Sequence, residues 1–266
     1  MFYYLGNNKG ILKTNLGLKL YVDSSEKSIT PHLITDSQWE PNITKFITSV
    51  LKPGMNVVEI GANIGYYSTI IAAKIGPQGH LWSFEPNSEV YKLLKLNLEI
   101  NGYSDRSSSI HGAVSDSSGM AQFTALEDHK VSSSLMCEED LNSIEARKYE
   151  NESRSFEFVN TYHLDNPALG FNGAQIDLLK MDAEGFEWKI FEGAQEFLSR
   201  NPKLQMIVEF VPEYLNLVSE NGAEKLLDMV LSRGYSLKWI DDQGRPIVAP
   251  KEELLGRHYS ELYLVK

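Results

Sequence analysis

The sequence has a single cysteine and no long apolar run. Cys137 has no second cysteine with which to form an internal disulfide or a cysteine-based metal cluster, so we expect a reducing, cytoplasmic setting. No segment approaches the roughly 18 consecutive apolar residues that span a bilayer. The first residues also lack the basic start and apolar core of a secretion signal. The sequence therefore predicts neither membrane insertion nor secretion.

Positive charge is also scarce. The 266 residues contain 25 Lys and Arg against 36 Asp and Glu, which gives a formal net charge of −11. The lysines are scattered and the arginines never form a run, so the chain would repel a phosphate backbone. We expect no nucleic-acid partner. The sequence leaves the oligomeric state open, and a homo-oligomer is compatible with it.

Several catalytic signatures are missing. The six histidines show no H-x-x-x-H or H-E-x-x-H spacing, and the chain has no G-x-S-x-G motif. These absences count against a zinc hydrolase and a serine hydrolase. The G-x-G-x-x-G fingerprint of dinucleotide binding is absent too, which counts against a nicotinamide-dependent oxidoreductase without removing it as an alternative.

The chain does contain short β-branched runs that alternate with segments of helical period from about residue 56 onward. This pattern predicts parallel strands joined by crossover helices. Two late strands, with no good helix between them, are expected to pair antiparallel. The predicted strands are residues 55–61, 80–86, 108–114, 176–182, 204–210, 235–240 and 259–266.

The chain divides into a small N-terminal part and a main domain. Residues 10–23 alternate apolar and polar residues around a T-N-L-G turn, which predicts a β-hairpin that caps the main sheet. We therefore assign residues 1–41 to this cap and residues 42–266 to the main domain. Within the main domain, residues 124–165 are polar, charged and poorly periodic, as expected of a long functional or disordered excursion.

The stretch E-I-G-A-N-I-G, residues 59–65, places two glycines at a strand-to-helix junction, where bare backbone lets a ligand approach. Glu85 ends the next strand about 20 residues later, the offset expected of a carboxylate that binds ribose hydroxyls. Glu59 would repel a pyrophosphate but suits an ammonium or a sulfonium group. These features favour S-adenosylmethionine (SAM), which has both groups and a ribose but no phosphate.

Acids recur where the predicted strands end. In an open α/β sheet, side chains beyond the carboxyl ends of the strands line one crevice. Strand alternation places Lys180 on the same side as Asp182, and Glu184 follows just beyond. A cluster of Asp182, Glu184 and Glu209 raises a Mg²⁺ hypothesis, because hard cations favour oxygen ligands. The four strand-end acids are Glu59, Glu85, Asp182 and Glu209.

The chain resembles the FkbM-type SAM-dependent methyltransferases in six segments. The resemblance implies a Rossmann-like class I methyltransferase fold, in which a seven-stranded, mostly parallel sheet has helices on both faces and SAM over its carboxyl edge. It also implies O-methylation of a sugar, glycan or polyketide hydroxyl. The six segments are QWEP (38–41), LKPGMNVVEIGANIGYYS (51–68), SFEPNSEVYKLLKLNLEING (83–102), GAVSDSSG (112–119), IDLLKMDAEGFEWKIFEGA (176–194) and IVEF (207–210).

The resemblance also implies roles for individual residues. Glu85 would bind the ribose, Val114 to Asp116 would lie at the adenine, and Asp182 would lie near the methyl group. The family usually has Asp where this chain has Glu59. The residues implied to hold the methionine end are Glu59, Gly61, Asn63 and Gly65.

Methyl transfer from a sulfonium is an in-line displacement with a neutral leaving group, so the protein must align and activate the acceptor. We predict that Asp182 is the general base or acceptor ligand, supported by Lys180 and Glu209. Two alternatives stay open. One is a nicotinamide-dependent oxidoreductase, and the other is a non-catalytic SAM-binding protein that docks a partner through residues 124–165.

Overall fold

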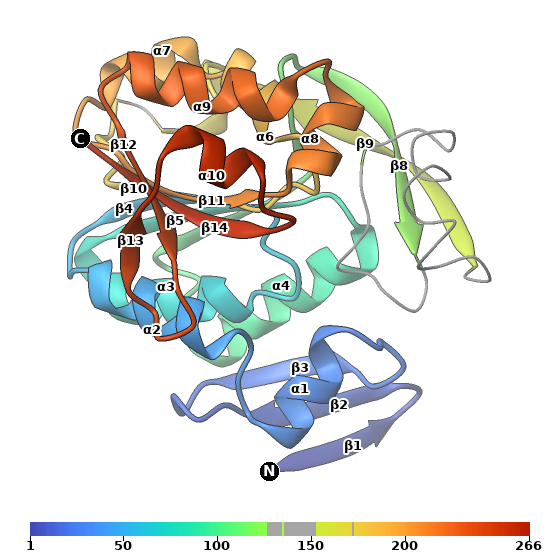
Figure 1. Cartoon of the computed structure of the whole chain (residues 1–266). Coiled ribbons are helices and arrows are strands. Elements are labelled where there is room, and N and C mark those ends of the chain that lie inside the picture. Colours follow the sequence, from blue (N-terminus) through green and yellow to red (C-terminus); the bar gives the residue numbers. More distant parts are fainter. Residues whose placement is uncertain (127–134, 136–152, 172) are drawn as a thin grey trace.

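The computed structural model describes residues 1–126, 135, 153–171 and 173–266. Most of the predicted excursion, including Cys137, lies outside the described residues. Figure 1 shows a large central sheet between two layers of helices, with a smaller sheet at the N-terminus and a third at one side.

The central sheet has eight strands, and those from β11 to β6 are mutually parallel. The predicted Rossmann-like fold is confirmed, and one short edge strand, β13, is added to the seven expected. The two late strands pair antiparallel as predicted, although a five-residue helix, α10, lies between them. In spatial order the strands are β13 (Pro246–Val248), β12 (Ser236–Ile240), β14 (Ser260–Val265), β11 (Gln205–Phe210), β10 (Leu178–Met181), β4 (Asn56–Ile60), β5 (His80–Glu85) and β6 (Ser107–His111).

Helices cover both faces of this sheet (Figure 1). Because side chains alternate along a strand, Val57 and Val58 of β4 are both fully buried but face opposite layers. The layer on the side of Val57 contains α2 (Pro41–Val50), α3 (Tyr66–Ile75) and α4 (Ser88–Ile100). The layer on the side of Val58 contains α6 (Glu187–Glu192), α7 (Gln195–Arg200), α8 (Pro212–Val218), α9 (Gly222–Ser232) and α10 (Lys251–Leu255). No helix in the described part of the chain is long and apolar enough to cross a bilayer.

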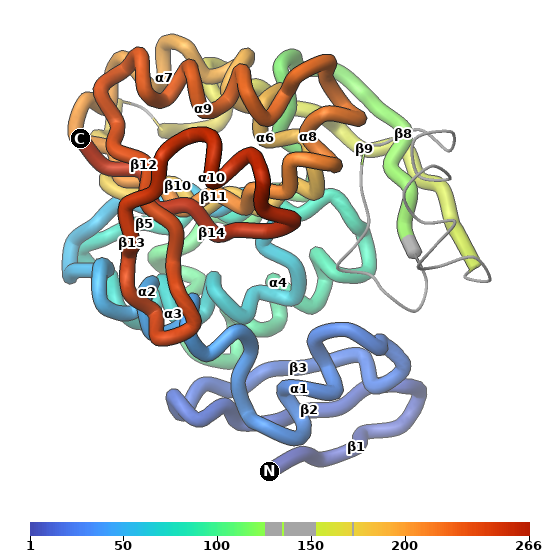
Figure 2. Tube along the Cα trace, in the orientation of Figure 1, coloured from blue at the N-terminus to red at the C-terminus, as the bar shows by residue number. Residues whose placement is uncertain are grey.

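The N-terminal segment, blue in Figure 2, forms its own antiparallel sheet. The predicted hairpin is formed by β2 and β3, and β1 adds a strand that was not expected. Asn97 of α4 and Asn101, the residue after its end, hold this sheet. The Asn97 amide donates to the Tyr21 carbonyl at 3.0 Å and accepts from its N–H at 2.6 Å, and Asn101 binds Lys19 in the same way. The elements of this part are β1 (Phe2–Gly6), β2 (Lys9–Lys13), β3 (Lys19–Asp23) and α1 (Ile29–Thr35).

A third sheet contains β7 (Ala113–Val114), β9 (Arg154–Tyr162) and β8 (Gly119–Leu126), in that spatial order. The prediction of one strand over residues 108–114 is wrong, because Gly112 turns the chain at a φ of +155°. A Cβ at Gly112 would lie 2.7 Å from the Asn160 carbonyl, so the backbone of β9 packs directly on this turn. Strands extend into both ends of the segment predicted as an excursion, because β8 ends at Leu126 and β9 covers Arg154–Tyr162, and these two strands pair antiparallel.

Candidate active site

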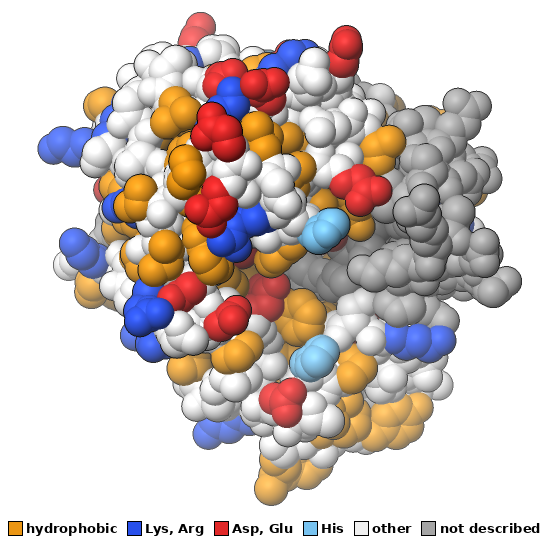
Figure 3. All heavy atoms as spheres, viewed as in Figure 1, with side chains coloured by type: hydrophobic (Ala, Val, Ile, Leu, Met, Phe, Trp, Pro, Cys, Tyr) orange, Lys and Arg blue, Asp and Glu red, His pale blue; other side chains and the backbone are white. Residues whose placement is uncertain are grey.

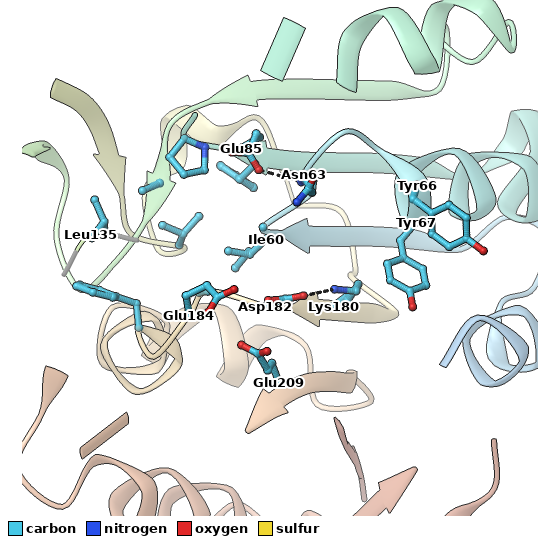
Figure 4. Close-up of a pocket in the computed structure, with 18 of the residues that line it drawn as sticks. Ile60, Asn63, Tyr66, Tyr67, Glu85, Leu135, Lys180, Asp182, Glu184 and Glu209 are labelled. Carbon is cyan, nitrogen blue, oxygen red and sulfur yellow. Dashed lines mark hydrogen bonds and ion pairs between the residues drawn. The ribbon is translucent and has the colours of Figure 1, made fainter. Parts of the chain in front are cut away.

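A cavity of about 210 Å³ opens at the carboxyl ends of the central strands (Figure 4). Strands β11, β10, β4 and β5 are neighbours in that order, so Glu209, Asp182, Gly61 and Glu85 lie along one edge of the sheet and all four line the cavity. The predicted crevice is therefore present, and these acids share one surface.

The turn from β4 into α3 requires left-handed backbone at Gly61 (φ +74°), Asn63 (φ +52°) and Gly65 (φ +85°). A Cβ on Gly61 would lie 1.8 Å from the Asp182 carbonyl, so this glycine permits the close contact between the ends of β4 and β10. A Cβ on Gly65 would lie 2.8 Å from the side chain of Leu94. Gly61 and Asn63 line the cavity, whereas Gly65 lets the turn pack on α4.

Glu85 is a buried acid in the cavity wall. Its Oε2 accepts the Asn63 N–H and its Oε1 accepts the Asn87 N–H, both at 2.8 Å. Burial raises the pKa of Glu85 to about 7, although these two hydrogen bonds lower it. Each carboxylate oxygen has a further lone pair with which to accept from a ligand hydroxyl. This position is compatible with the predicted ribose contact.

Glu59 lies beneath the cavity and does not form its wall. The side chain is fully buried, and its Oε2 accepts hydrogen bonds from the hydroxyls of Ser68 and Ser83. Burial raises the pKa of Glu59 to about 7, and its cross-strand neighbour Lys180 lowers it. Glu59 pairs with Lys180 and Ser83, two residues before the level that Asp182 and Glu85 occupy at the strand ends, and it is not among the residues of the cavity wall. The predicted direct contact of Glu59 with the methionine end is therefore not supported by its position.

Lys180 and Asp182 form an ion pair, with 3.3 Å between Nζ and Oδ2 (Figure 4). They share one side of β10, as predicted. Burial alone lowers the pKa of Lys180, but nearby carboxylates, Asp182 first among them, raise it above its ordinary value. The Lys180 side chain is 3% exposed, whereas that of Asp182 is 34% exposed and reaches the cavity. A buried cation thus fixes a carboxylate at the cavity wall.

Glu184, Glu209 and Glu261 gather beside this pair. Carboxylate oxygens of Asp182, Glu184 and Glu209 lie within 4.8 Å of one another, which is compatible with the Mg²⁺ hypothesis. The ion itself stays a prediction. Oε2 of Glu209 is buried and finds no hydrogen-bond partner in the described part of the chain. Burial raises the pKa of Glu209 well above its ordinary value, and Asp182 and Glu184 raise it further. Glu261 of β14 lies directly opposite Glu209.

Of the residues predicted to lie at the adenine, Val114 lines the cavity and Asp116 does not. Val114 of β7 lines the cavity, together with Phe123 of β8. The side chain of Asp116 is paired with Lys189 of α6 at 3.3 Å and is not part of the cavity wall. The predicted contact of Asp116 is therefore not supported, because a distant lysine engages its carboxylate. The apolar pair Val114 and Phe123 offers the surface on which a purine ring could pack.

The fold brings to this site four residues for which the sequence predicts no role, although Trp39 and Glu40 belong to the resembling segment QWEP. Trp39 and Glu40 precede α2, and Tyr259 precedes β14; all three line the cavity. Glu261 follows on β14, which runs antiparallel and so begins at the edge where its neighbours end. In the sequence, Glu261 is an acid within an otherwise apolar strand, which is the pattern that led to the prediction of Glu209. Trp39 and Glu40 carry no such local signal.

The sequence profile of the methyltransferase FkbM domain matches residues 59–237, more than half of the chain. The chain belongs to the FkbM methyltransferase family. Its matched region is a SAM-dependent methyltransferase domain, and its methyl donor is SAM. This agrees with the acids and glycines that the fold gathers at one sheet edge.

Curated relatives and solved structures carry related names. The chain is 28% identical over 159 residues to methyltransferase sdnD of Sordaria araneosa, covering 53% of this chain and 60% of that protein. It is 39% identical over 74 residues to protein-L-isoaspartate O-methyltransferase of Methanothermobacter thermautotrophicus, covering 27% and 34%. Neither match spans two thirds of the relative's length. A solved SAM-dependent O-methyltransferase of Thermotoga maritima is 14% identical with a TM-score of 0.46, covering 96% of this chain and 77% of that one.

The polar and apolar groups of the cavity wall fit SAM. Glu85 presents carboxylate oxygens to a ribose, and Val114 and Phe123 present an apolar wall to a purine. Lys180 is the one basic residue among the described residues of the wall, and Asp182 already pairs with it. The described part of the FkbM cavity therefore favours a nucleoside with positive charge and offers no free cation of the kind that a pyrophosphate requires.

Replacing Glu261 with Gln is expected to raise the Tm of the ligand-free FkbM protein at pH 8 by roughly 5 °C. Burial first, and then nearby carboxylates, raise the pKa of Glu261 to about 8, against 4.5 in the unfolded chain. The folded state thus holds a proton that the unfolded state releases, so stability falls as the pH rises between these values. Gln does not titrate, so the Glu261→Gln variant should not lose stability in this way as the pH rises.

Thermal unfolding at pH 5 and pH 8 measures the effect. The wild type should lose stability over this interval, and Glu261→Gln should lose less. Glu253→Gln is the matched control, because Glu253 is an exposed acid paired with Arg257 on the surface. Equal pH slopes for the wild type and Glu261→Gln would show that Glu261 is ionised in the folded protein.

Proposed function

We propose that this FkbM domain transfers the methyl group of SAM to a hydroxyl of a small molecule, namely a sugar, a glycan or a polyketide-type compound. The observation that carries the proposal is Asp182, a carboxylate held at the cavity wall by the buried Lys180. The relative from Methanothermobacter is named as an O-methyltransferase, which supports an oxygen acceptor. On the face shown in Figure 3, Lys and Arg are interspersed with Asp and Glu, which supports a small acceptor over a nucleic acid.

Each side chain has a separate role in the proposed reaction. When bound, SAM supplies a methyl group on a positively charged sulfur. Asp182 accepts the proton of the acceptor hydroxyl as the oxygen–methyl bond forms and the sulfur–methyl bond breaks, and the sulfur leaves as a neutral thioether. Lys180 keeps Asp182 in position, and the other acids of the wall attract the positively charged donor into the cavity. The proton passes from Asp182 to solvent, since its side chain is partly exposed.

Binding of S-adenosylhomocysteine (SAH) tests the donor site directly. We expect SAH at 100 times its dissociation constant to stabilise the protein by about 2.7 kcal/mol. NADH at the same concentration should give no shift. Glu85→Gln should weaken SAH binding about 10- to 100-fold, because it removes a charged hydrogen-bond acceptor. Differential scanning calorimetry with both ligands measures these shifts.

Glu89→Gln is the matched control for Glu85→Gln, because Glu89 is an exposed acid on α4 that pairs with Lys92 on the surface. A thermal shift with NADH but none with SAH would overturn the proposal in favour of an oxidoreductase. SAH binding without turnover across a broad panel of hydroxyl compounds would point to a non-catalytic SAM-binding protein.

A further inference from the structure

The strand order divides the cavity into two parts. Glu85 on β5 lies at the predicted ribose end, and Gly61 follows on β4. Asp182 and Glu209 come next, after β10 and on β11. Adjacent strands are about 4.8 Å apart, so Glu209 lies roughly 14 Å along the edge from Glu85. A donor that extends from Glu85 to the glycine turn leaves the β10–β11 side to the acceptor.

Residues from outside the matched FkbM domain complete this side of the cavity. Trp39 and Glu40 precede residue 59, and Tyr259 follows residue 237. They meet there because α2 packs against the sheet and β14 runs antiparallel. The matched domain thus supplies the donor part together with Asp182 and Glu209, and the segments on either side of it supply Trp39, Glu40 and Tyr259. We call Trp39, Glu40, Asp182, Glu209 and Tyr259 the acceptor subsite.

Glu40 is held in a costly backbone conformation at this wall. Its φ of 39° and ψ of 71° are left-handed, although it is not a glycine and precedes Pro41. Two hydrogen bonds maintain the turn. The hydroxyl of Thr44 donates to the Trp39 carbonyl at 2.8 Å, and the hydroxyl of Tyr67 donates to Oε2 of Glu40 at 2.8 Å. Strain of this kind concentrates where a side chain must be presented to a ligand.

Negative charge exceeds positive charge in this part of the cavity. Three acids of the subsite, Glu40, Asp182 and Glu209, line it, and among the described residues of the wall the one cation is Lys180. A SAM molecule carries only one net positive charge, so a surplus remains when the donor is bound.

Building on the proposed methyl transfer, we propose that the acceptor subsite selects hydroxylated rings by their charge. A ring that bears an ammonium group is preferred over a neutral ring, and a neutral ring is strongly preferred over one that bears a carboxylate. Trp39 and Tyr259 provide aromatic faces for the apolar side of such a ring and for its ammonium. Glu40 accepts from its hydroxyls or its ammonium.

Three matched glycosides test the order. Methyl glucoside, its 6-amino-6-deoxy analogue and methyl glucuronide differ only at carbon 6. With saturating SAM at pH 7, we expect kcat/KM to fall by about 10-fold or more at each step from amine to hydroxyl to carboxylate. Glu40→Gln should reduce the ratio of kcat/KM between the amino glycoside and the glucuronide about tenfold, and it should leave SAH binding intact. The exposed control Glu253→Gln should leave the ratio unchanged.

The outcomes separate this inference from the proposed function. Equal or better turnover of the glucuronide would overturn the charge order, whatever the variants do. If SAH binds but none of the three glycosides is methylated or bound, the assignment of a hydroxylated ring is overturned and the methyltransferase stands. If SAH does not bind, the donor site itself is refuted, and the acceptor subsite with it.

Discussion

Replacing Asp182 with Asn is expected to lower kcat by about 10²–10⁴-fold, the usual contribution of a general base, and to leave SAH affinity nearly unchanged. The substitution keeps the size of the side chain but removes the charge that accepts the acceptor proton. The backbone N–H of Asp182 donates to the Ile60 carbonyl at 3.1 Å, and this contact persists in the variant. Single-turnover kinetics with a hydroxyl acceptor and calorimetry with SAH measure the two quantities.

Asp228→Asn is the control for this prediction, because Asp228 is an exposed acid on α9 that pairs with Lys251. Each assay is run with EDTA and again with added Mg²⁺. A metal bound by Asp182, Glu184 and Glu209 would make the wild-type rate depend on Mg²⁺. Full turnover by Asp182→Asn with normal SAH binding would remove Asp182 as the base and leave Glu40 or Glu209 as the candidate.

The part of the site that lies at the ends of parallel strands can be predicted from the sequence. Glu85, Asp182 and Glu209 each end an apolar run, and parallel strands bring such ends to one edge. The structure gathers them around one cavity. Glu59 also lies near the end of such a run, but the register pairs it with Lys180 and Ser83, two residues before the level of Asp182 and Glu85. The register between strands is set by packing, so the sequence alone does not separate Glu59 from the other acids.

The rest of the site depends on contacts that no local pattern encodes. Glu40 reaches the cavity through a left-handed turn before a proline, which sequence propensity disfavours. Tyr259 reaches it, and Glu261 lies opposite Glu209, because an antiparallel strand begins where the parallel strands end. Asp116 is engaged by Lys189, 73 positions away. Long-range packing decides each of these positions, and the spacing of residues in one sequence carries no record of it.

Replacing Lys180 with Met is expected to destabilise the folded protein by about 3–5 kcal/mol, because removing one partner of a buried ion pair leaves the other charges uncompensated. Burial keeps the pKa of Glu59 and of Glu261 raised, and in both groups Lys180 opposes that shift. Without the ammonium these carboxyls should hold their protons to higher pH. Because the unfolded chain releases those protons, the variant should lose more stability at pH 8 than at pH 5.

Urea unfolding at the two pH values measures this loss, and two further variants identify its cause. Lys189→Met is the matched control, because Lys189 pairs with Asp116 and Glu192 on the surface, where such pairs contribute little. Adding Glu59→Gln to Lys180→Met removes one uncompensated carboxyl, so the double variant should regain stability, chiefly at pH 8. A pH-independent loss that Glu59→Gln fails to relieve would show that Lys180 stabilises the fold by packing and not by compensating the acids of the site.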